Sequence, residues 1–79
     1  MNIEALIKIK LMSQADPSAV LIAVRNVPLV QWARLAFGPD ADIIAFVIGP
    51  DQNTVANTAM QINQIPGVAS TSTIILATI

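Results

Sequence analysis

The sequence predicts an α+β fold whose elements follow one another as β-α-β-β-α-β. Three observations support this prediction. Residues 3–11 alternate between apolar and polar side chains, which is typical of a half-buried strand. Residues 30–48 form two strand-like runs around a polar turn. The two halves of the chain also resemble each other, which indicates that one β-α-β unit occurs twice.

Residues 3–11 form the first expected strand. Isoleucine, leucine and alanine occupy most alternate positions, with charged residues between them. Because a strand directs successive side chains to opposite faces, one face is apolar and the other is polar. The charged residues of the polar face are Glu4, Lys8 and Lys10.

The first helix is expected over residues 17–26. Asp16 suits the N-cap, and Pro17 suits the first helical position. Pro28 disfavours helical backbone at the residue before it, so the helix should end there. Its apolar side is expected to carry Val20, Leu21, Val24 and Val27.

Residues 30–48 predict an antiparallel hairpin at the centre of the sheet. Two runs rich in Val, Ile, Phe and Trp suit strands. Between them, residues 38–42 contain Gly, Pro and two Asp, which favour a turn. The first strand of the hairpin is therefore expected to continue to Phe37.

The second helix is expected from about Asp51, as a cap, to Gln64. Its apolar stripe is Val55, Ala59 and Ile62, with Met60 at the margin. The side chains expected to face water are Thr54, Asn57, Thr58 and Gln61. After Ile65-Pro66-Gly67, residues 70–79 are rich in Thr and Ile and predict the last strand.

An internal similarity indicates how these elements assemble. Residues 25–30 (RNVPLV) resemble residues 63–68 (NQIPGV), with Pro28 aligned on Pro66 and thus a shift of 38 residues. The same shift places the first helix on the second. Two β-α-β halves of this kind form the ferredoxin-like arrangement, with two helices on one face of a four-stranded antiparallel sheet.

The composition predicts a homodimer. The 79 residues form one small domain, which is 54% hydrophobic and 11% charged. A core of this size is marginal, and a chain without Cys or His lacks disulfides and the commonest metal sites. The sheet face without helices would still carry apolar side chains, so we expect a second copy to cover it in a dimeric α/β barrel-like assembly. The interface is expected to include Leu6, Trp32, Arg34, Ile44, Phe46 and Ile48.

Two of these residues have alternative roles. Trp32 is expected to pack in the core or the interface rather than serve as a ligand platform. Arg34 shares its face. It is expected to pair with Glu4 or with an acid of another subunit, or else to bind a ligand carboxylate.

Several function classes are disfavoured. A net charge of −1 with four basic residues does not suit nucleic-acid binding. No apolar run approaches the roughly 18 residues of a membrane span, and the N-terminus is unlike a signal peptide, so we expect a cytoplasmic protein. Without Cys, His or Tyr, the usual groups for nucleophilic catalysis are missing. We therefore expect no enzymatic activity and no cofactor. A metal site made only of Asp40, Asp42 and Asp51 is conceivable, because hard cations take carboxylates. Three acids spread over two loops make it a weak candidate, so we expect no metal.

The hairpin loop gathers candidate ligand groups. Asp40 or Asp42 could accept a ligand ammonium, while Gly38 and the loop amides hold a carboxylate in a backbone nest. Together these contacts suit a free amino acid. Alternatively, the two aspartates only cap backbone amides in the turn. Thr71 and Thr73 share one strand face, either because Thr favours strands or because their hydroxyls bind the ligand.

The loop and the last strand resemble the effector-binding (RAM) domain of the Lrp/AsnC, or feast/famine, transcriptional regulators. Residues 38–45 (GPDADIIA) are similar to the family's Gly, turn and Asp before an apolar strand. Residues 66–76 (PGVASTSTIIL) are similar to its Pro-Gly-Val and Thr-x-Thr motifs. The resemblance covers essentially the whole chain. It implies sheet-to-sheet dimers, higher assemblies, and amino acids or related metabolites bound between dimers by Gly38, Asp42, Thr71 and Thr73.

Three hypotheses follow. The first is a stand-alone effector-binding domain without its own DNA-binding domain, because the chain begins at its first strand; it could co-assemble with full-length regulators. The second is a purely structural oligomerisation module, because the loop is one residue longer than the family's Gly-x-Tyr-Asp and lacks the Tyr. The third, a small enzyme of the dimeric α/β-barrel kind, would need His, Tyr or paired acids in a cavity.

Overall fold

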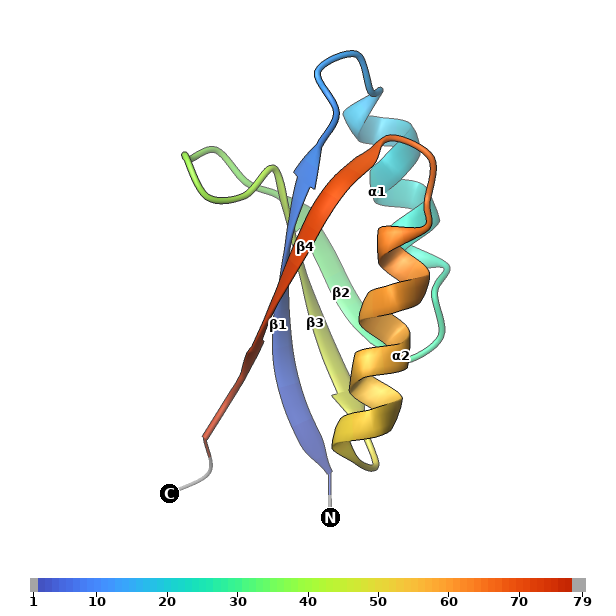
Figure 1. Ribbon diagram of the computed structural model, residues 1–79, viewed down its shortest axis with the longest axis vertical. Helices are drawn as coiled ribbons and strands as arrows, with labels where there is room; N and C mark the ends of the chain where they lie inside the picture. The colour runs from blue at the N-terminus through green and yellow to red at the C-terminus, as the bar shows by residue number, and fades with distance from the viewer. Residues whose placement is uncertain (1, 78–79) are drawn as a thin grey trace.

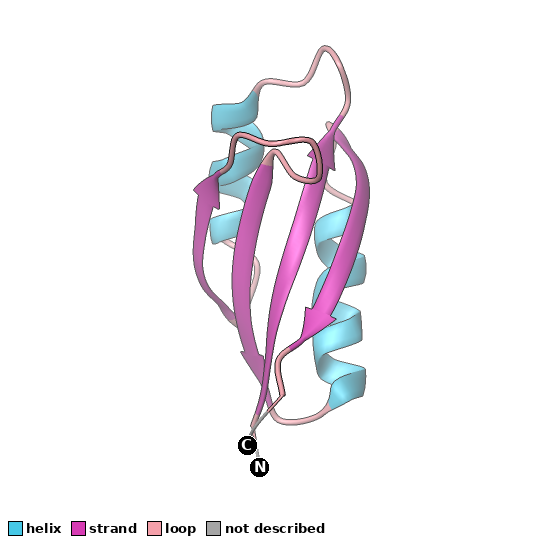
Figure 2. Cartoon of the chain, turned by 90° about the vertical axis from the view of Figure 1, so that its left-hand side faces the viewer, coloured by secondary structure: helices cyan, strands magenta, loops and turns pink. Residues whose placement is uncertain are grey.

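The six expected elements are present in the computed structural model, which describes residues 2–77. They are β1 (Ile3–Leu11), α1 (Pro17–Arg25), β2 (Val30–Leu35), β3 (Ile43–Gly49), α2 (Gln52–Asn63) and β4 (Val68–Ile75). The strands form one antiparallel sheet in the order β2-β3-β1-β4. Both helices cover one face and leave the other face open (Figures 1 and 2). The predicted ferredoxin-like fold is confirmed.

Alternation along the strands places the core between the sheet and the helices. Ile7 of β1 is fully buried opposite Ala45 of β3, and Ala5 is fully buried opposite Val47. Burying a large aliphatic side chain contributes about 1.5–3 kcal/mol, so this layer holds the helices on the sheet. The helices contribute Val20, Val24, Val55 and Ile62 to it.

An aspartate caps the start of each helix. Asp16 Oδ1 accepts the backbone N–H of Ser18 at 3.0 Å. Asp51 Oδ1 accepts both the backbone N–H and the hydroxyl of Thr54, at 2.7 and 2.8 Å. Both caps satisfy amides that lack a partner within the first helical turn. The predicted starts are confirmed, and neither helix is long and apolar enough to cross a membrane.

The hairpin differs from the prediction in two respects. β2 is an edge strand, so the centre of the sheet is β3 beside β1 rather than the hairpin itself. β2 also ends at Leu35, and Phe37 belongs to the connecting loop. The N–H of Asp42 donates to the Ile9 carbonyl of β1 at 2.8 Å. On the β2 side, the N–H of Ala36 donates to the Asp42 carbonyl at 2.9 Å, which closes the hairpin, and Phe37 follows in the loop.

The free edge of β2 is partly covered by α1. Arg25 donates through Nε and one terminal nitrogen to the Ala33 carbonyl oxygen, at 3.0 and 2.8 Å. Unpaired carbonyls on an edge strand invite pairing with another chain. The guanidinium therefore both ties α1 to the sheet and occupies an acceptor on this edge.

Two further expectations need correction. Thr58 was expected to face water, but it is 4% exposed, and its hydroxyl donates to the Thr54 carbonyl at 3.0 Å. That bond satisfies the hydroxyl within the helix, so Thr58 tolerates burial beside Val55 and Ile62. β4 begins at Val68, two residues earlier than predicted, and ends at Ile75. Residues 78 and 79 of the predicted strand lie outside the described residues.

The open face of the sheet carries the predicted apolar side chains as a patch over β2, β3 and the middle of β1. Polar residues share this face, namely Glu4, Lys8 and Lys10 of β1 and Ser70 and Ser72 of β4. Trp32 is 41% exposed and stacks on Phe46 with ring centroids 5.7 Å apart and an interplanar angle of 22°. The guanidinium carbon of Arg34 lies 5.4 Å from the centroid of the Trp32 ring. Half-buried aliphatic side chains continue this face across β3 and β1, namely Leu6, Ile44 and Ile48.

Arg34 does not reach Glu4 within the chain. The register places Arg34 opposite Ile44 and Glu4 opposite Ile48, at the two ends of β3. Among residues 2–77, Lys10 and Asp42 are the only ion pair. The expected pairing of Arg34 with Glu4 is therefore absent from the single chain.

Candidate functional site

The hairpin loop (residues 36–42) is fastened to the end of β1. Asp42 Oδ2 accepts the backbone N–H of Leu11 at 2.8 Å and lies 3.6 Å from Lys10 Nζ. Lys10 Nζ also donates to the Pro39 carbonyl at 3.5 Å. At the base of the loop, the N–H of Ala36 donates to the Asp42 carbonyl at 2.9 Å. The alternation of side chains along β1 places Lys10 on the open face, and the pairing of β1 with β3 places it beside the hairpin loop.

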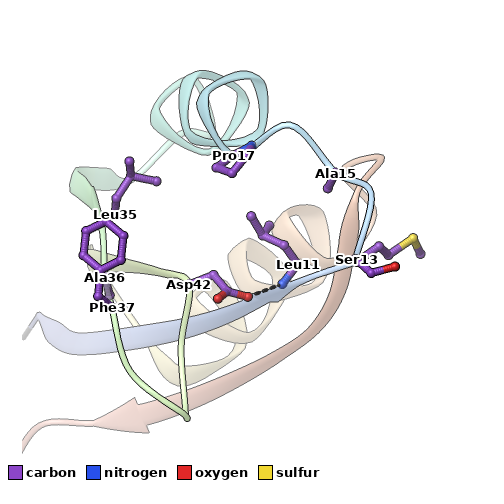
Figure 3. Close-up of a pocket in the computed structure, with 9 residues that line it drawn as sticks. Leu11, Ser13, Ala15, Pro17, Leu35, Ala36, Phe37 and Asp42 are labelled. Atoms are coloured by element: carbon purple, nitrogen blue, oxygen red, sulfur yellow. Dashed lines mark hydrogen bonds between the residues drawn. The ribbon is translucent and has the colours of Figure 1, made fainter.

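A hollow opens beside this loop, where β1 and β2 end and β3 begins. We call it the terminal cavity. Its volume is about 360 Å³, which is near the lower end of the range for small-molecule sites, roughly 300–1,000 Å³. In Figure 3, Leu35, Ala36 and Phe37 lie on one side and Ser13 and Ala15 on the other, with Pro17 above. The lining residues are Leu11, Met12, Ser13, Ala15, Pro17, Leu35, Ala36, Phe37 and Asp42.

Asp42 supplies the one ionisable side chain in the lining of the terminal cavity. A carboxylate has about four acceptor positions. The Leu11 N–H and Lys10 both approach Oδ2, and within the described residues Oδ1 has no hydrogen-bond partner. The cavity therefore combines mostly apolar walls with one carboxylate oxygen that is able to accept a cationic donor.

The other predicted ligand residues lie elsewhere. Gly38 and Asp40 are exposed in the hairpin loop and do not line the terminal cavity. Thr71 borders a groove with Ala59 of α2, and Thr73 borders a second groove along the same helix. β1 lies between β4 and β3 and separates both threonines from Asp42. Within one chain, the structure does not bring the five predicted residues together.

Sequence patterns alone did not identify most of the cavity lining. Met12 and Ser13 belong to the β1–α1 connection and Pro17 begins α1, and only the sheet topology brings this part of the chain to the hairpin loop. Lys10, the partner of Asp42, was expected only as one of the charged residues on the polar face of the first strand. No periodicity or spacing in the sequence predicts that these lining residues lie beside the hairpin loop, or that Lys10 pairs with Asp42.

The comparisons with known proteins agree with the fold. The model of the "Lrp/AsnC ligand binding domain" family matches residues 4–78. None of the curated proteins matches the chain. The Thermus thermophilus protein TTHA0845 is 24% identical with a TM-score of 0.86, over 98% of this chain and 95% of that one.

Two longer proteins share the same fold. E. coli AsnC is 22% identical with a TM-score of 0.85, over 98% of this chain and 52% of its own. The Neisseria meningitidis transcriptional regulator NMB0573, solved as a complex with L-Met, is 18% identical with a TM-score of 0.82. That match covers 96% of this chain and 50% of the regulator. At these identities the likeness concerns the fold.

Proposed function

The chain belongs to the Lrp/AsnC ligand-binding domain family, and from this premise we propose that it binds a small amino acid or a related metabolite and forms oligomers. The proposed role is regulatory, in transcription or amino-acid metabolism, and cytoplasmic. It involves no reaction catalysed by this domain. Full-length regulators of the family are candidate partners for co-assembly.

The observation that carries this proposal is the terminal cavity with Asp42 in its wall. A free amino acid has an ammonium, a carboxylate and a side chain. Asp42 Oδ1 would accept the ammonium, and apolar walls such as those of Leu11 and Leu35 would surround the side chain. A charge-assisted hydrogen bond of this kind is worth about 1.5–3 kcal/mol. Interactions with Leu11 and Lys10 already hold the Asp42 side chain in place, so little conformational entropy is lost when it binds a ligand.

Gly38, Asp40, Thr71 and Thr73 enter this proposal through a second subunit. Gly38, Asp40 and Thr73 are exposed, and Thr71 is half-buried. Because Thr71 and Thr73 lie apart from Asp42 in one chain, they would have to face the ligand from another copy. A site shared between subunits would link ligand binding to assembly.

The second subunit is proposed to dock on the open sheet face. Trp32 and Phe46 form its aromatic centre, and aromatic residues and arginine are enriched at protein interfaces. In the single chain Trp32 remains 41% exposed. Packing two such faces would cover Trp32, Arg34 and the aliphatic side chains of β1 and β3 together.

A purely structural oligomerisation module is the alternative function. The observation that favours it is the bonding of Asp42, whose Oδ2 already serves Leu11 and Lys10. In this alternative the carboxylate has only the loop-capping role that turn aspartates commonly have. The open face would still form the dimer, but the terminal cavity would bind no metabolite.

The two functions are separated by calorimetric titration of the chain with each of the twenty amino acids. The Asp42→Asn variant keeps an oxygen for the Leu11 N–H but removes the charge. The Asp51→Asn variant removes the same charge from the cap of α2, which does not line the terminal cavity. We expect at least one amino acid to bind wild type and Asp51→Asn equally, and Asp42→Asn about tenfold or more weaker. Absence of binding up to millimolar concentrations would favour the structural module.

A further inference from the structure

Two residues of opposite charge, Glu4 and Lys8, lie on either side of Leu6 on the open face of β1. All three side chains point to this face, because side chains alternate along a strand. Leu6 and Lys8 are half-buried, and Glu4 is exposed. Among residues 2–77 neither charge belongs to an ion pair. Both are therefore solvated in one chain, on the face where the proposed function places a second copy.

The apolar side chains of the open face are arranged symmetrically about the same row. The register sets Leu6 opposite Phe46 of β3, on the face that is turned toward the viewer in Figure 2. An isoleucine lies on each side of Phe46 along β3, opposite the two charged residues, namely Ile44 and Ile48. Reversing the strand direction therefore exchanges isoleucine with isoleucine, but it exchanges the acid with the base. Only the charges distinguish the two ends of this pattern.

A second copy can cover the open face in two aligned orientations. The two-fold axis of such a dimer lies in the plane between the sheets, because the rotation must turn one open face toward the other. An axis along the strands keeps their direction, so rows of the same number face each other. An axis across the strands at Leu6 reverses their direction, so the row of Glu4 faces the row of Lys8.

We propose that Glu4 and Lys8 make the open face specific for a second copy of this chain in the reversed orientation, in which Glu4 of each copy pairs with Lys8 of the other. Leu6 and Phe46 then meet their own counterparts at the two-fold axis. The inference rests on the proposed function, which places a second copy on this face. The ion pair goes beyond that function because it selects the orientation and the identity of the partner.

The other cation of this face favours the same orientation. Arg34 lies in the row of Lys8, since both are opposite Ile44. An axis along the strands would set this basic row against its own copy and bring four positive charges together, which opposes association. The reversed orientation sets the basic row against the row of Glu4 instead. The guanidinium of Arg34 is also placed near the Trp32 ring, 5.4 Å from its centroid, where a cation is attracted.

The dimensions of packed sheets bring the two charges within reach. Aligned sheets lie about 10 Å apart and cross at about 30°. Successive side chains on one face of a strand are about 7 Å apart, so this crossing shifts Glu4 sideways from the other copy's Lys8 by only about 3 Å. A glutamate and a long, flexible lysine side chain together bridge the remaining distance. A related domain without both residues would leave one charge unpaired, so copies of this chain are preferred.

Sedimentation equilibrium of charge-reversed variants tests the ion pair. Glu4→Lys and Lys8→Glu each place like charges together twice in the dimer, so each is expected to raise the dimer dissociation constant at least tenfold. The double variant Glu4→Lys/Lys8→Glu restores the pairs and the net charge of −1, and should return to within about threefold of wild type. Gln61→Lys, at an exposed position of α2, is the control and should dimerise as wild type does.

Cross-linking measures the orientation directly, because the chain has no Cys of its own. Glu4→Cys and Lys8→Cys are mixed in equal amounts and treated with a short bismaleimide. Positions 4 and 8 lie about 13 Å apart along β1, so the reversed orientation brings unlike positions together and keeps like positions apart. Mass spectrometry is expected to find mainly links between the two variants, rather than links within either one.

Three results would overturn the inference: charge-reversed variants that all dimerise as wild type does, a double variant no tighter than the single ones, or cross-links mainly between like positions. Phe46→Glu separates this failure from failure of the proposed dimer. If Phe46→Glu dissociates the dimer but the charge variants do not, the open face is the interface and the charges do not orient it. If wild type is monomeric at micromolar concentration, the ion pair and the proposed dimer are both wrong.

Discussion

Leu29 and Gly67 occupy equivalent positions in the two halves of the chain, and both turn the backbone with a positive φ, 77° and 98°. The hydrogen bonds around them also correspond. Val27 N–H donates to the Val24 carbonyl before Leu29, and Ile65 N–H donates to the Ile62 carbonyl before Gly67. The same left-handed turn therefore leads from each helix into the strand that follows it.

The second turn depends on glycine. A Cβ on Gly67 would lie 3.0 Å from Val20 Cγ2 and 3.1 Å from Ala15 Cβ, and its φ of 98° strains any other residue. We expect Gly67→Ala to lower the free energy of unfolding by about 1–3 kcal/mol, measured by urea denaturation. Gly38→Ala is the control, since a Cβ there meets nothing within 4 Å. Equal stability of the two variants would contradict this account of the turn.

The side chain of Asp42 should control how readily the Leu11 backbone N–H, at the end of β1, becomes accessible to hydrogen exchange. Its Oδ2 is the partner of the Leu11 N–H, and an unpaired, partly buried donor costs about 1 kcal/mol. Hydrogen exchange of the Leu11 amide, followed by NMR, should be roughly fivefold faster in Asp42→Ala. Asp42→Asn should exchange as wild type does, because the amide oxygen remains an acceptor.

Lys10 provides a further control for Asp42. The ion pair between them is long and half-exposed, and such pairs contribute about 0–1 kcal/mol. Lys10→Met should therefore change the Leu11 exchange rate much less than Asp42→Ala does. A larger effect of Lys10→Met would mean that the charge pair, rather than the hydrogen bond, holds the loop.

Stability at acid pH should depend on the cap of α2. The hydrogen bond from the Thr54 N–H, followed by the one from its hydroxyl, lowers the pKa of Asp51 below its ordinary value of 3.8. The unfolded chain therefore takes up this proton at a higher pH than the folded chain. The stabilisation is fully present above the unfolded pKa and is lost as the pH falls through the folded pKa.

Asp51→Asn isolates that effect, because asparagine caps a helix about as well as aspartate and does not titrate. Below a pH of about 3.8, the unfolding free energy of the variant should fall less steeply than that of wild type. Urea denaturation at a series of pH values measures both slopes. If the unfolding free energies of variant and wild type fell equally steeply with pH, protonation of Asp51 would not weaken the cap of α2.

Periodicity and turn chemistry were sufficient to predict all six elements, because these are local properties of the chain. Asp16 and Pro17 identified the start of α1, and alternation identified β1. The residues around the terminal cavity are brought together by the sheet topology, which local sequence patterns do not reveal. Asp42 and Thr71 were expected to share one ligand at a site between dimers, and within one chain β1 lies between them. The expected position of Phe37 in a strand was wrong because the bond from the Ala36 N–H to the Asp42 carbonyl closes the hairpin just before it.

The last prediction concerns the open face, on which the proposed dimer depends. A glutamate at position 46 would place a charge where Phe46 now stacks on Trp32. Burying an unpaired charge within the apolar patch around Phe46 costs several kcal/mol, so Phe46→Glu should weaken dimerisation at least a hundredfold. Sedimentation equilibrium measures this. The control is Ile22→Glu, which adds the same charge at an exposed apolar residue of α1 and should leave the dimer intact.

Trp32 gives an independent measure of the same contact, because it is the single tryptophan of the chain. In the dimer its ring would be covered, whereas in one chain it is 41% exposed. Diluting wild type should therefore shift the fluorescence to longer wavelength and increase quenching by acrylamide, with the same midpoint as sedimentation. Fluorescence and mass that do not change on dilution, in a chain that is monomeric at micromolar concentration, would show that these apolar side chains remain in water. The surface of stacked rings would then have no partner copy, and the shared site proposed for the ligand would lose its second subunit.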